Sequence, residues 1–339
     1  STDLDCCELS ESLPFLNMNS MVLANGRHSL QLPRFDTPTP LQLISPLTRE
    51  DLHAEADTKG QELTSQIENL DEVEIDNSLS ANKCNFTALR VVEFNMDRGK
   101  RWLEFASLLE SEDSVDIIIL NEMDFGMARS NQQHTTRLLA QKLGFNYAWG
   151  LEFVELTRGT REEQNVVTTG VDFYGLHGNA VLSRCRITNA QIIRDPIGMY
   201  FSSKKLALNA HGFEKRLGGR MALLTKIQIG EYSVNVGSLH KVDSETVFEK
   251  IQKYIGGHNQ RSIIGGDQSS HICELLHLEE LSRENTWPAS CDTLGREKGD
   301  ILCTNFASND SVTMRPCLRS EVSSIKLSDH SIIKSTLLL

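Results

Sequence analysis

From Leu89 onward the sequence consists of short apolar runs that end in residues able to bind metal or move protons. Each run has the length and composition of a β-strand. Because loops at strand ends are held in place by a rigid sheet, we expect these polar residues to converge on one site. The runs and the residues that follow them are Leu89 to Phe94 with Asn95 and Asp97, Val115 to Leu120 with Asn121 and Glu122, Tyr232 to Leu239 with His240, and Arg261 to Ile264 with Asp267.

The rest of this region predicts more strands than helices. Many strands at irregular spacing, with few helices between them, favour an α+β sandwich of two sheets over a doubly wound parallel sheet. The further candidate strands are Asn179 to Leu182, Arg220 to Ile227, Asp300 to Cys303 and Ser331 to Leu337. The candidate helices are Lys100 to Leu109, Asn131 to Leu143 and Ser244 to Ile255.

Residues 1–85 differ from the rest of the chain. Residues 1–76 hold 15 acidic and 4 basic residues, so this part carries -11 of the net charge of -12. Its prolines and sparse apolar residues predict a partly disordered extension, either a docking tail or a solvated leader, that is dispensable for folding. Residues 86–339 are expected to form the catalytic domain. Their near-neutral charge weakens the case for a protein that grips long nucleic acid, without excluding it.

Within the extension, Thr48 to Asp51 could cap an acidic helix that reaches Ile67. The apolar residues Leu52, Leu63, Ile67 and Leu70 are too sparse in the sequence for a strong amphipathic face.

The sequence favours a soluble intracellular protein, placed in the cytoplasm. The first residues do not resemble a signal peptide, and no apolar run approaches the ~20 residues of a membrane span. Eight cysteines show no CxxC pair, so reduced thiols are expected. Nothing in the sequence points to oligomerisation.

Seven short motifs follow one another in the chain. In this order and spacing they resemble the endonuclease/exonuclease/phosphatase superfamily, which includes pancreatic-type deoxyribonuclease, inositol polyphosphate 5-phosphatases and neutral sphingomyelinases. The resemblance spans roughly Leu89 to Leu337 and implies a deoxyribonuclease I-like fold, a four-layer α/β/β/α sandwich of two packed mixed β-sheets. The motifs are Asn95-Met96-Asp97, Asn121-Glu122, Gly178 to Arg184, Ser238-Leu239-His240, Gly265-Gly266-Asp267, Gly299 to Leu302 and Ser328-Asp329-His330.

The resemblance also implies a bound divalent cation. Glu122 is its expected main ligand, with Asn95 and Asp329 beside it and Asp97 as a further ligand. Such an all-oxygen set suits Mg²⁺ or Mn²⁺ rather than zinc.

Four further residues take catalytic roles by the same resemblance. Asp267 is expected to orient or deprotonate the attacking water, and His240 to bond the phosphate or its developing oxyanion. His330 is expected to contact the scissile phosphate, while Asp300 fixes its tautomer. Which group is the base stays open, because the groups titrate together.

Phosphate contacts are expected from Arg220, Asn179 and Ser269. Ser269 marks a departure, because the family usually reads Gly-Asp-x-Asn where this chain has Asp267-Gln268-Ser269. A serine can donate one hydrogen bond from a shorter side chain. Eight other histidines, His134 and His177 among them, lie in no recognised motif and are expected to be surface or packing residues.

The sequence therefore predicts a metal-dependent hydrolase of phosphoester bonds that uses in-line attack of an activated water. A phosphodiesterase, a nuclease and a phosphatase all remain possible, acting on a phosphorylated small molecule, a nucleotide or nucleic acid. The alternative is a catalytically weak or inactive family member that serves as a binding scaffold. A scaffold has no chemical need for Glu122, His240, Asp267, Asp300, Asp329 and His330 together.

Overall fold

The structure is a computed structural model of the chain. It describes residues 23–24, 27–30, 43–45, 47–80, 84, 86–110, 115–160, 163, 175–195, 200–201, 214–256, 260–269, 271–281, 300–305, 308–314, 317–319, 324–328, 330 and 332–338.

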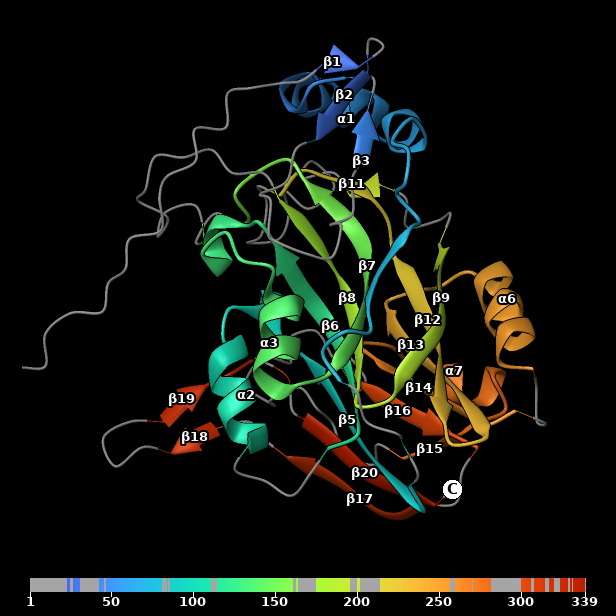
Figure 1. Ribbon diagram of the computed structural model, residues 1–339. Coiled ribbons are helices and arrows are strands. Elements are labelled where there is room, and N and C mark those ends of the chain that lie inside the picture. The colour runs from blue at the N-terminus through green and yellow to red at the C-terminus, as the bar shows by residue number, and fades with distance from the viewer. Residues whose placement is uncertain are drawn as a thin grey trace, which may run out of the picture.

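Two mixed β-sheets lie face to face (Figure 1). The larger has nine strands in the order β10-β11-β7-β8-β6-β5-β20-β17, with β4 also paired to β7, and the smaller has six in the order β15-β16-β14-β13-β12-β9. The predicted sandwich of two mixed sheets is therefore confirmed. The strands of the larger sheet are β4 (Val73–Asp76), β5 (Ala88–Asn95), β6 (Ile117–Phe125), β7 (Asn146–Glu155), β8 (Leu176–Ser183), β10 (Tyr200–Phe201), β11 (Arg216–Gly218), β17 (Ser308–Met314) and β20 (Ile332–Leu338). Those of the smaller sheet are β9 (Arg186–Arg194), β12 (Met221–Ile229), β13 (Tyr232–His240), β14 (Ser262–Gly266), β15 (Glu279–Glu280) and β16 (Ile301–Thr304).

The period of two in a β-strand explains how the layers form. Along β6, Ile117 and Ile119 point into the core between the sheets, whereas Ile118 and Leu120 point to the outer face of the larger sheet. A strand buried on both faces needs apolar residues at successive positions, which is why this run is continuous rather than alternating.

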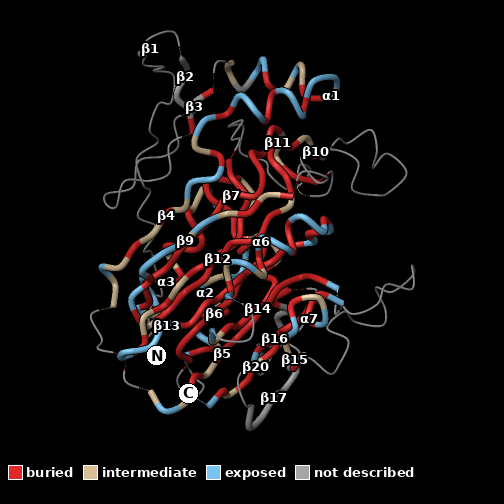
Figure 2. The backbone as a smooth tube through the Cα atoms, turned by 90° about the vertical axis from the view of Figure 1, so that its right-hand side faces the viewer, coloured by how far each residue is buried: buried red, intermediate tan, exposed pale blue. Residues whose placement is uncertain are grey.

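Helices cover the two outer faces. Helices α2 (Trp102–Glu110) and α3 (Thr135–Leu143) pack on the larger sheet, and α6 (Glu245–Ile255) and α7 (His271–Leu275) pack on the smaller one (Figure 1). Figure 2 shows that buried residues run through both sheets, while exposed residues lie on helices, on the edge strand β9 and in loops. No helix in the described part of the chain is long and apolar enough to cross a membrane.

Two parallel strand pairs bring the polar strand ends together. Strand β5 runs parallel to β6 with Asn95 opposite Asn121, and β13 runs parallel to β14 with Ser238 opposite Gly265. Parallel neighbours present their carboxyl ends at the same edge of a sheet. The predicted strands were located correctly, but β7, β9, β17 and several shorter strands, β4 among them, were not anticipated.

Part of the expected extension packs on the sandwich. Thr48 caps α1 (Arg49–Ser65) through a capping box with Asp51, as the sequence suggested. The apolar residues judged too sparse are buried, with Leu52 1% and Leu63 2% exposed. Strand β4 also pairs with β7. The boundary near residue 85 stays a prediction, but this packing argues against an extension that is dispensable for folding.

Smaller elements flank this framework. A three-stranded sheet and a two-stranded sheet are separate from the two main ones. Two single-turn 3₁₀ helices follow β5 and β6 in the chain. They are β1 (Leu23–Ala24), β2 (Arg27–Leu30), β3 (Leu43–Ser45), β18 (Cys317–Arg319), β19 (Ser324–Lys326), η1 (Asp97–Gly99) and η2 (Ala128–Ser130).

The expectation of reduced thiols is wrong for four cysteines. Cys84 is disulfide-bonded to Cys185 and Cys273 to Cys303, with Cα atoms 5.6 and 5.7 Å apart. These separations are typical of protein disulfides. Sequence spacing could not reveal them because each pair joins segments that meet only in the folded protein.

A buried polar cluster holds β4 against the larger sheet. Glu74 Oε1 accepts hydrogen bonds from Tyr147 Oη at 2.5 Å and Arg137 Nη2 at 2.8 Å, and His134 Nε2 lies 3.1 Å away. Burial alone would raise the pKa of the Glu74 carboxyl, but the charges and hydrogen bonds of His134, Arg137 and Tyr147 lower it to about 2. The cluster therefore stabilises an ionised carboxylate inside the protein.

This cluster makes stability depend on pH. Because the folded-state pKa of Glu74 is depressed, its contribution is present above the unfolded value near 4.5 and is lost as the pH falls toward 2. Glu74→Gln should cost about 3 kcal/mol in urea unfolding at pH 7, at ~1.4 kcal/mol for each unit of pKa, and clearly less at pH 3. The exposed neighbour variant Glu72→Gln is the control. An equal loss at both pH values would contradict this account.

Candidate active site

Glu122 lies at a break in the pairing between β6 and β8. The register shifts between Leu120 and Met123, and Glu122 itself has φ of +57°. Bulges of this kind redirect a side chain next to active sites. The Glu122 backbone N–H donates to Asn179 Oδ1 at 3.3 Å, and Asn95 Nδ2 donates to Glu122 Oε1 at 3.3 Å. Asn95, Glu122 and Asn179 therefore meet at one point.

Asn121 joins the two sheets beside this point. Its Nδ2 donates to Ser238 Oγ at 3.0 Å, and its Oδ1 accepts from the backbone N–H of Asp267 at 2.7 Å. Ser238 Oγ in turn donates to the carbonyl oxygen of Leu120 at 2.9 Å. The ends of β6, β13 and β14 are thereby fixed relative to one another.

His240 is held by a carboxylate that the sequence reasoning missed. Glu152 on β7 is fully buried; its Oε2 lies 2.7 Å from His240 Nδ1, and its Oε1 accepts from Arg220 Nη1 at 2.7 Å. The other ring nitrogen, Nε2, lies 3.7 Å from Glu122 Oε1 and 3.6 Å from Asp267 Oδ2. Burial would lower the pKa of His240, but Glu152 outweighs it, and the pKa is raised above 6.5.

Asp267 is an ionised carboxylate at neutral pH. Burial would raise its pKa, but His240, Lys241 and His330 lower it to about 2. Lys241 Nζ lies 3.0 Å from Asp267 Oδ2. Gly266, just before it, has φ of +138°, and a Cβ there would sit 1.9 Å from the carbonyl oxygen of Leu239. This glycine is therefore required for the close approach of β14 to β13.

His330 and Asp300 form a second buried pair. His330 Nδ1 lies 2.8 Å from Asp300 Oδ2, which is the contact that the resemblance implies. Near this pair, neither carboxylate oxygen of Glu93 has a hydrogen-bond partner among the described residues. Burial first, and then the charges of Asp300 and Asp267, raise the pKa of Glu93 well above 4.5. Its surroundings therefore favour the neutral, protonated form of Glu93.

The other predicted site residues differ in how close they lie to the site. Arg220 lies against His240, with Nη1 3.1 Å from Nε2, and Asp97 stays close to Asn95 because its backbone N–H donates to Asn95 Oδ1 at 3.1 Å. The Asp97 carboxylate pairs with Lys100 at 3.0 Å. Ser269 is exposed, and Asn179 is fully buried against the Glu122 backbone. The predicted ligand Asp329 lies outside the described residues.

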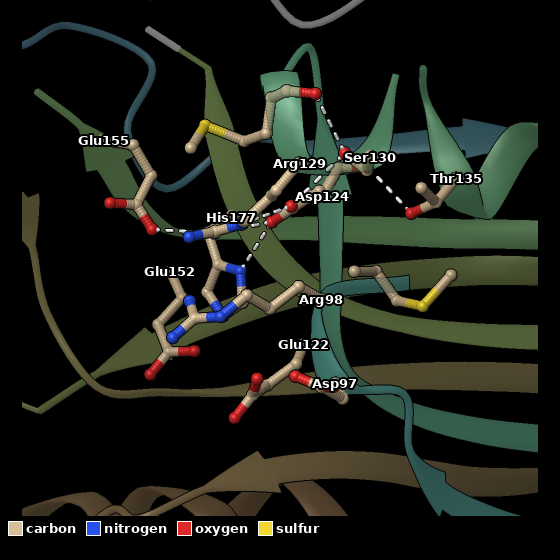
Figure 3. A network of polar contacts seen from close by, with 12 residues as sticks. Asp97, Arg98, Glu122, Asp124, Arg129, Ser130, Thr135, Glu152, Glu155 and His177 are labelled. Carbon is tan, nitrogen blue, oxygen red and sulfur yellow. Dashed lines mark hydrogen bonds and ion pairs between the residues drawn. The ribbon is translucent and has the colours of Figure 1, made fainter. Parts of the chain in front are cut away.

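A buried ion-pair cluster adjoins Glu122 (Figure 3). Arg129 Nε and Nη2 pair with Asp124 and Glu155 at 2.7 and 3.0 Å, and Arg98 pairs with Glu163 and Glu214 at 3.2 and 3.1 Å. Arg98 reaches this position because Asp97, Arg98 and Gly99 all have positive φ. Backbone strain of this sort is found at functional sites. The sequence signal of the cluster is the placement of Asp124 and Glu155 within the otherwise apolar strands β6 and β7.

Two sets of side chains could hold a cation. Glu122 and Asn95 offer oxygen atoms of the kind that Mg²⁺ prefers. Burial would raise the pKa of Glu122, but the charges of Arg98 and the nearby histidines outweigh burial and hold this pKa well below 4.5. Separately, Glu152, His177 and His240 each offer one ligand atom, and these atoms lie within 4.8 Å of one another. The first set is the one that the sequence resemblance implies.

No protein-family model matches the sequence, and no curated protein matches it either. The structure is similar to several solved structures, two of which are described as endonuclease/exonuclease/phosphatase proteins. One from Beutenbergia cavernae DSM 12333 has a TM-score of 0.47 and 15% identity, covering 75% of this chain and 72% of that one. One from Leptotrichia buccalis C-1013-b has a TM-score of 0.46 and 12% identity, covering 74% and 100%. Sphingomyelinase C from Streptomyces griseocarneus has a TM-score of 0.44 and 13% identity, covering 74% and 100%.

The Glu152 contact predicts a change in the titration of His240. A raised pKa means that His240 stabilises the fold below its unfolded value and that this contribution is lost as the pH rises through the folded pKa. Glu152→Gln should lower the pKa of His240, read from its imidazole signals by NMR. The control is Glu155→Gln, which alters a buried glutamate of the same strand that pairs with Arg129 and Arg216. An unchanged His240 pKa in Glu152→Gln would show that other groups set it.

Proposed function

We propose that the protein is a divalent-metal-dependent hydrolase of phosphoester bonds that uses in-line attack of an activated water. The observation that carries this proposal is the convergence of ionised and imidazole groups from the ends of strands in both sheets. Glu122 comes from the larger sheet, and His240 and Asp267 come from the smaller one, with 3.6 and 3.7 Å contacts between them. A phosphoester hydrolase needs such an assembly to orient water and to neutralise phosphoryl charge.

The cation would be held by Glu122 and Asn95, with Asp97 and Asp329 proposed as further ligands. The donor set fits Mg²⁺ or Mn²⁺, because the Glu122 carboxylate is ionised and the Asn95 side chain lies 3.3 Å from it. When bound, such an ion neutralises phosphoryl charge and polarises the P–O bond.

The remaining groups have complementary tasks. Asp267 has a pKa of about 2, which makes it a weak proton acceptor, so we propose that it orients the attacking water by accepting its hydrogen bond. His240, with its raised pKa, can donate from Nε2 to a phosphate oxygen while Glu152 holds Nδ1. His330, oriented by Asp300, can donate to the same phosphate. Arg220, held by Glu152, adds a fixed positive charge.

The first test concerns the cation. Glu122→Gln removes one full charge from the ligand set, so calorimetric titration of Mg²⁺ or Mn²⁺ should show markedly weaker binding than in wild type. Glu110→Gln, which changes a carboxylate on the exposed side of α2 that is 44% exposed, should bind the cation normally. Unchanged affinity in Glu122→Gln would place the cation elsewhere.

The second test concerns the reaction. A panel of phosphodiesters and phosphomonoesters, including DNA, RNA, nucleotides, inositol phosphates and sphingomyelin, is assayed in Mg²⁺ and in EDTA. On the best substrate, Asp267→Asn and His330→Ala should each lose ~10²- to 10⁴-fold in turnover. The double variant should be only slightly worse than the weaker single one, because both residues serve one transition state.

Circular dichroism and the exposed-site variant His271→Ala control for effects on folding. Near-wild-type turnover in either single variant would overturn the assignment of the site. The scaffold alternative predicts instead that no substrate of the panel is hydrolysed faster in Mg²⁺ than in EDTA.

A further inference from the structure

Three buried side chains form a second possible ligand set at the edge of the proposed active site, and one of them, His240, belongs to that site as well. Glu152, His177 and His240 are each at most 2% exposed, and they come from three different strands, β7, β8 and β13. Their ligand atoms lie within 4.8 Å of one another. Two imidazoles and one carboxylate differ chemically from the oxygen donors of Glu122 and Asn95.

The hydrogen bonding of His177 already resembles that of a metal ligand. Its Nδ1 lies 2.9 Å from Asp124 Oδ1, and Arg129 fixes that carboxylate at 2.7 and 2.9 Å. In Figure 3 a dashed line joins the His177 ring to the Asp124 carboxylate. A carboxylate on one ring nitrogen fixes the tautomer and leaves the other, Nε2, free to bind metal. Packing alone needs no such arrangement.

The ligand atoms, which lie within 4.8 Å of one another, would have to move when a metal binds. Zinc binds nitrogen and oxygen at about 2.0 to 2.2 Å, so tetrahedral ligand atoms lie about 3.4 Å apart. The Glu152 and His240 atoms are closer than this, at 2.7 Å, because they share a hydrogen bond. A cation bound between them would displace that proton to solvent, while His240 Nε2 would continue to face Glu122 and Asp267.

The charges around these residues also favour a cation. Among the described residues, ion pairs link the charged side chains around the site into two groups. The first holds five acids, Asp97, Asp124, Glu155, Glu163 and Glu214, and four bases, Arg98, Lys100, Arg129 and Arg216. The second holds three acids, Glu122, Glu152 and Asp267, and two bases, Arg220 and Lys241. With the histidines left out of the count, eight acids against six bases leave an excess of two negative charges, which favours cations in this part of the protein.

We propose that Glu152, His177 and His240 form a cation site, separate from that of Glu122, which takes a divalent transition metal such as Zn²⁺ rather than Mg²⁺. Imidazole nitrogen is a good ligand for Zn²⁺ and Co²⁺, whereas Mg²⁺ prefers oxygen. The second-layer carboxylate of Asp124 and the bond from Arg220 to Glu152 hold two of the three ligands in place. The site does not require that the protein hydrolyse phosphoesters.

The test uses Co²⁺ as a spectroscopic probe on the full chain, with saturating Mg²⁺ present to fill the oxygen site. Co²⁺ bound by two imidazoles and a carboxylate should give visible absorption far stronger than hydrated Co²⁺, and Zn²⁺ should abolish it. His177→Gln should weaken Co²⁺ binding about 100-fold or more, and Asp124→Asn about 10- to 100-fold. The matched control His271→Gln, at a histidine whose side chain is 67% exposed, should bind Co²⁺ like wild type.

Further arms separate this proposal from the one for Glu122. Glu122→Gln should retain the Co²⁺ absorption while its Mg²⁺ binding is weakened. Where His177→Gln does not fold, Glu152→Gln, of nearly equal size, should show the same loss of Co²⁺ affinity. Near-ultraviolet charge-transfer absorption would reveal thiolate ligands and overturn the proposal. So would a Co²⁺ spectrum that is unchanged in His177→Gln or Glu152→Gln.

Discussion

The arrangement of the site depends on the side chain of Asn121. Two β-sheets packed by apolar residues alone can slide over each other at little cost, because apolar contact has no direction. Asn121 removes that freedom, since its amide donates to Ser238 in the other sheet and accepts from the backbone of Asp267. These hydrogen bonds are buried, so leaving either partner unsatisfied costs on the order of 1–3 kcal/mol. The distance between Glu122 and Asp267 is therefore fixed by a polar link.

A second property of the site is how much charge is buried around it. Arg129 and Glu155 are almost completely shielded from water, and each has several partners of opposite charge. Replacing such pairs by apolar residues is often neutral or stabilising, so stability alone does not account for them. Fixed charges that need no reorganisation are what an enzyme uses to stabilise charge that develops during a reaction. The cluster suits a scaffold for charged chemistry better than one for packing.

The sequence predicted much of this arrangement, because strand ends carry a local signal. Asn95, Glu122, His240 and Asp267 each follow an apolar run, and the parallel pairing of those runs brings them together. Glu152 was missed because it lies inside strand β7, where an acid in an apolar run has no meaning until its partner His240, 88 residues away, is known.

Two other differences have similar causes. The position of Arg98 depends on three successive residues with positive φ, which only the backbone reveals. The buried face of α1 was missed because Leu52 and Leu63 are far apart in sequence and gain their burial from β11 and its neighbours.

The position of β20 in the larger sheet has a consequence for how the protein is made. This strand follows all the other described strands in sequence, yet it lies between β5 and β17 and pairs with β5 from Ala88 to Glu93. While the chain is being synthesised, β5 therefore has one edge without a partner until β20 has left the ribosome. Unpaired apolar edges of this kind attract other strands. We expect interrupted synthesis products of this chain to depend on chaperones, whereas the finished chain closes its own sheet.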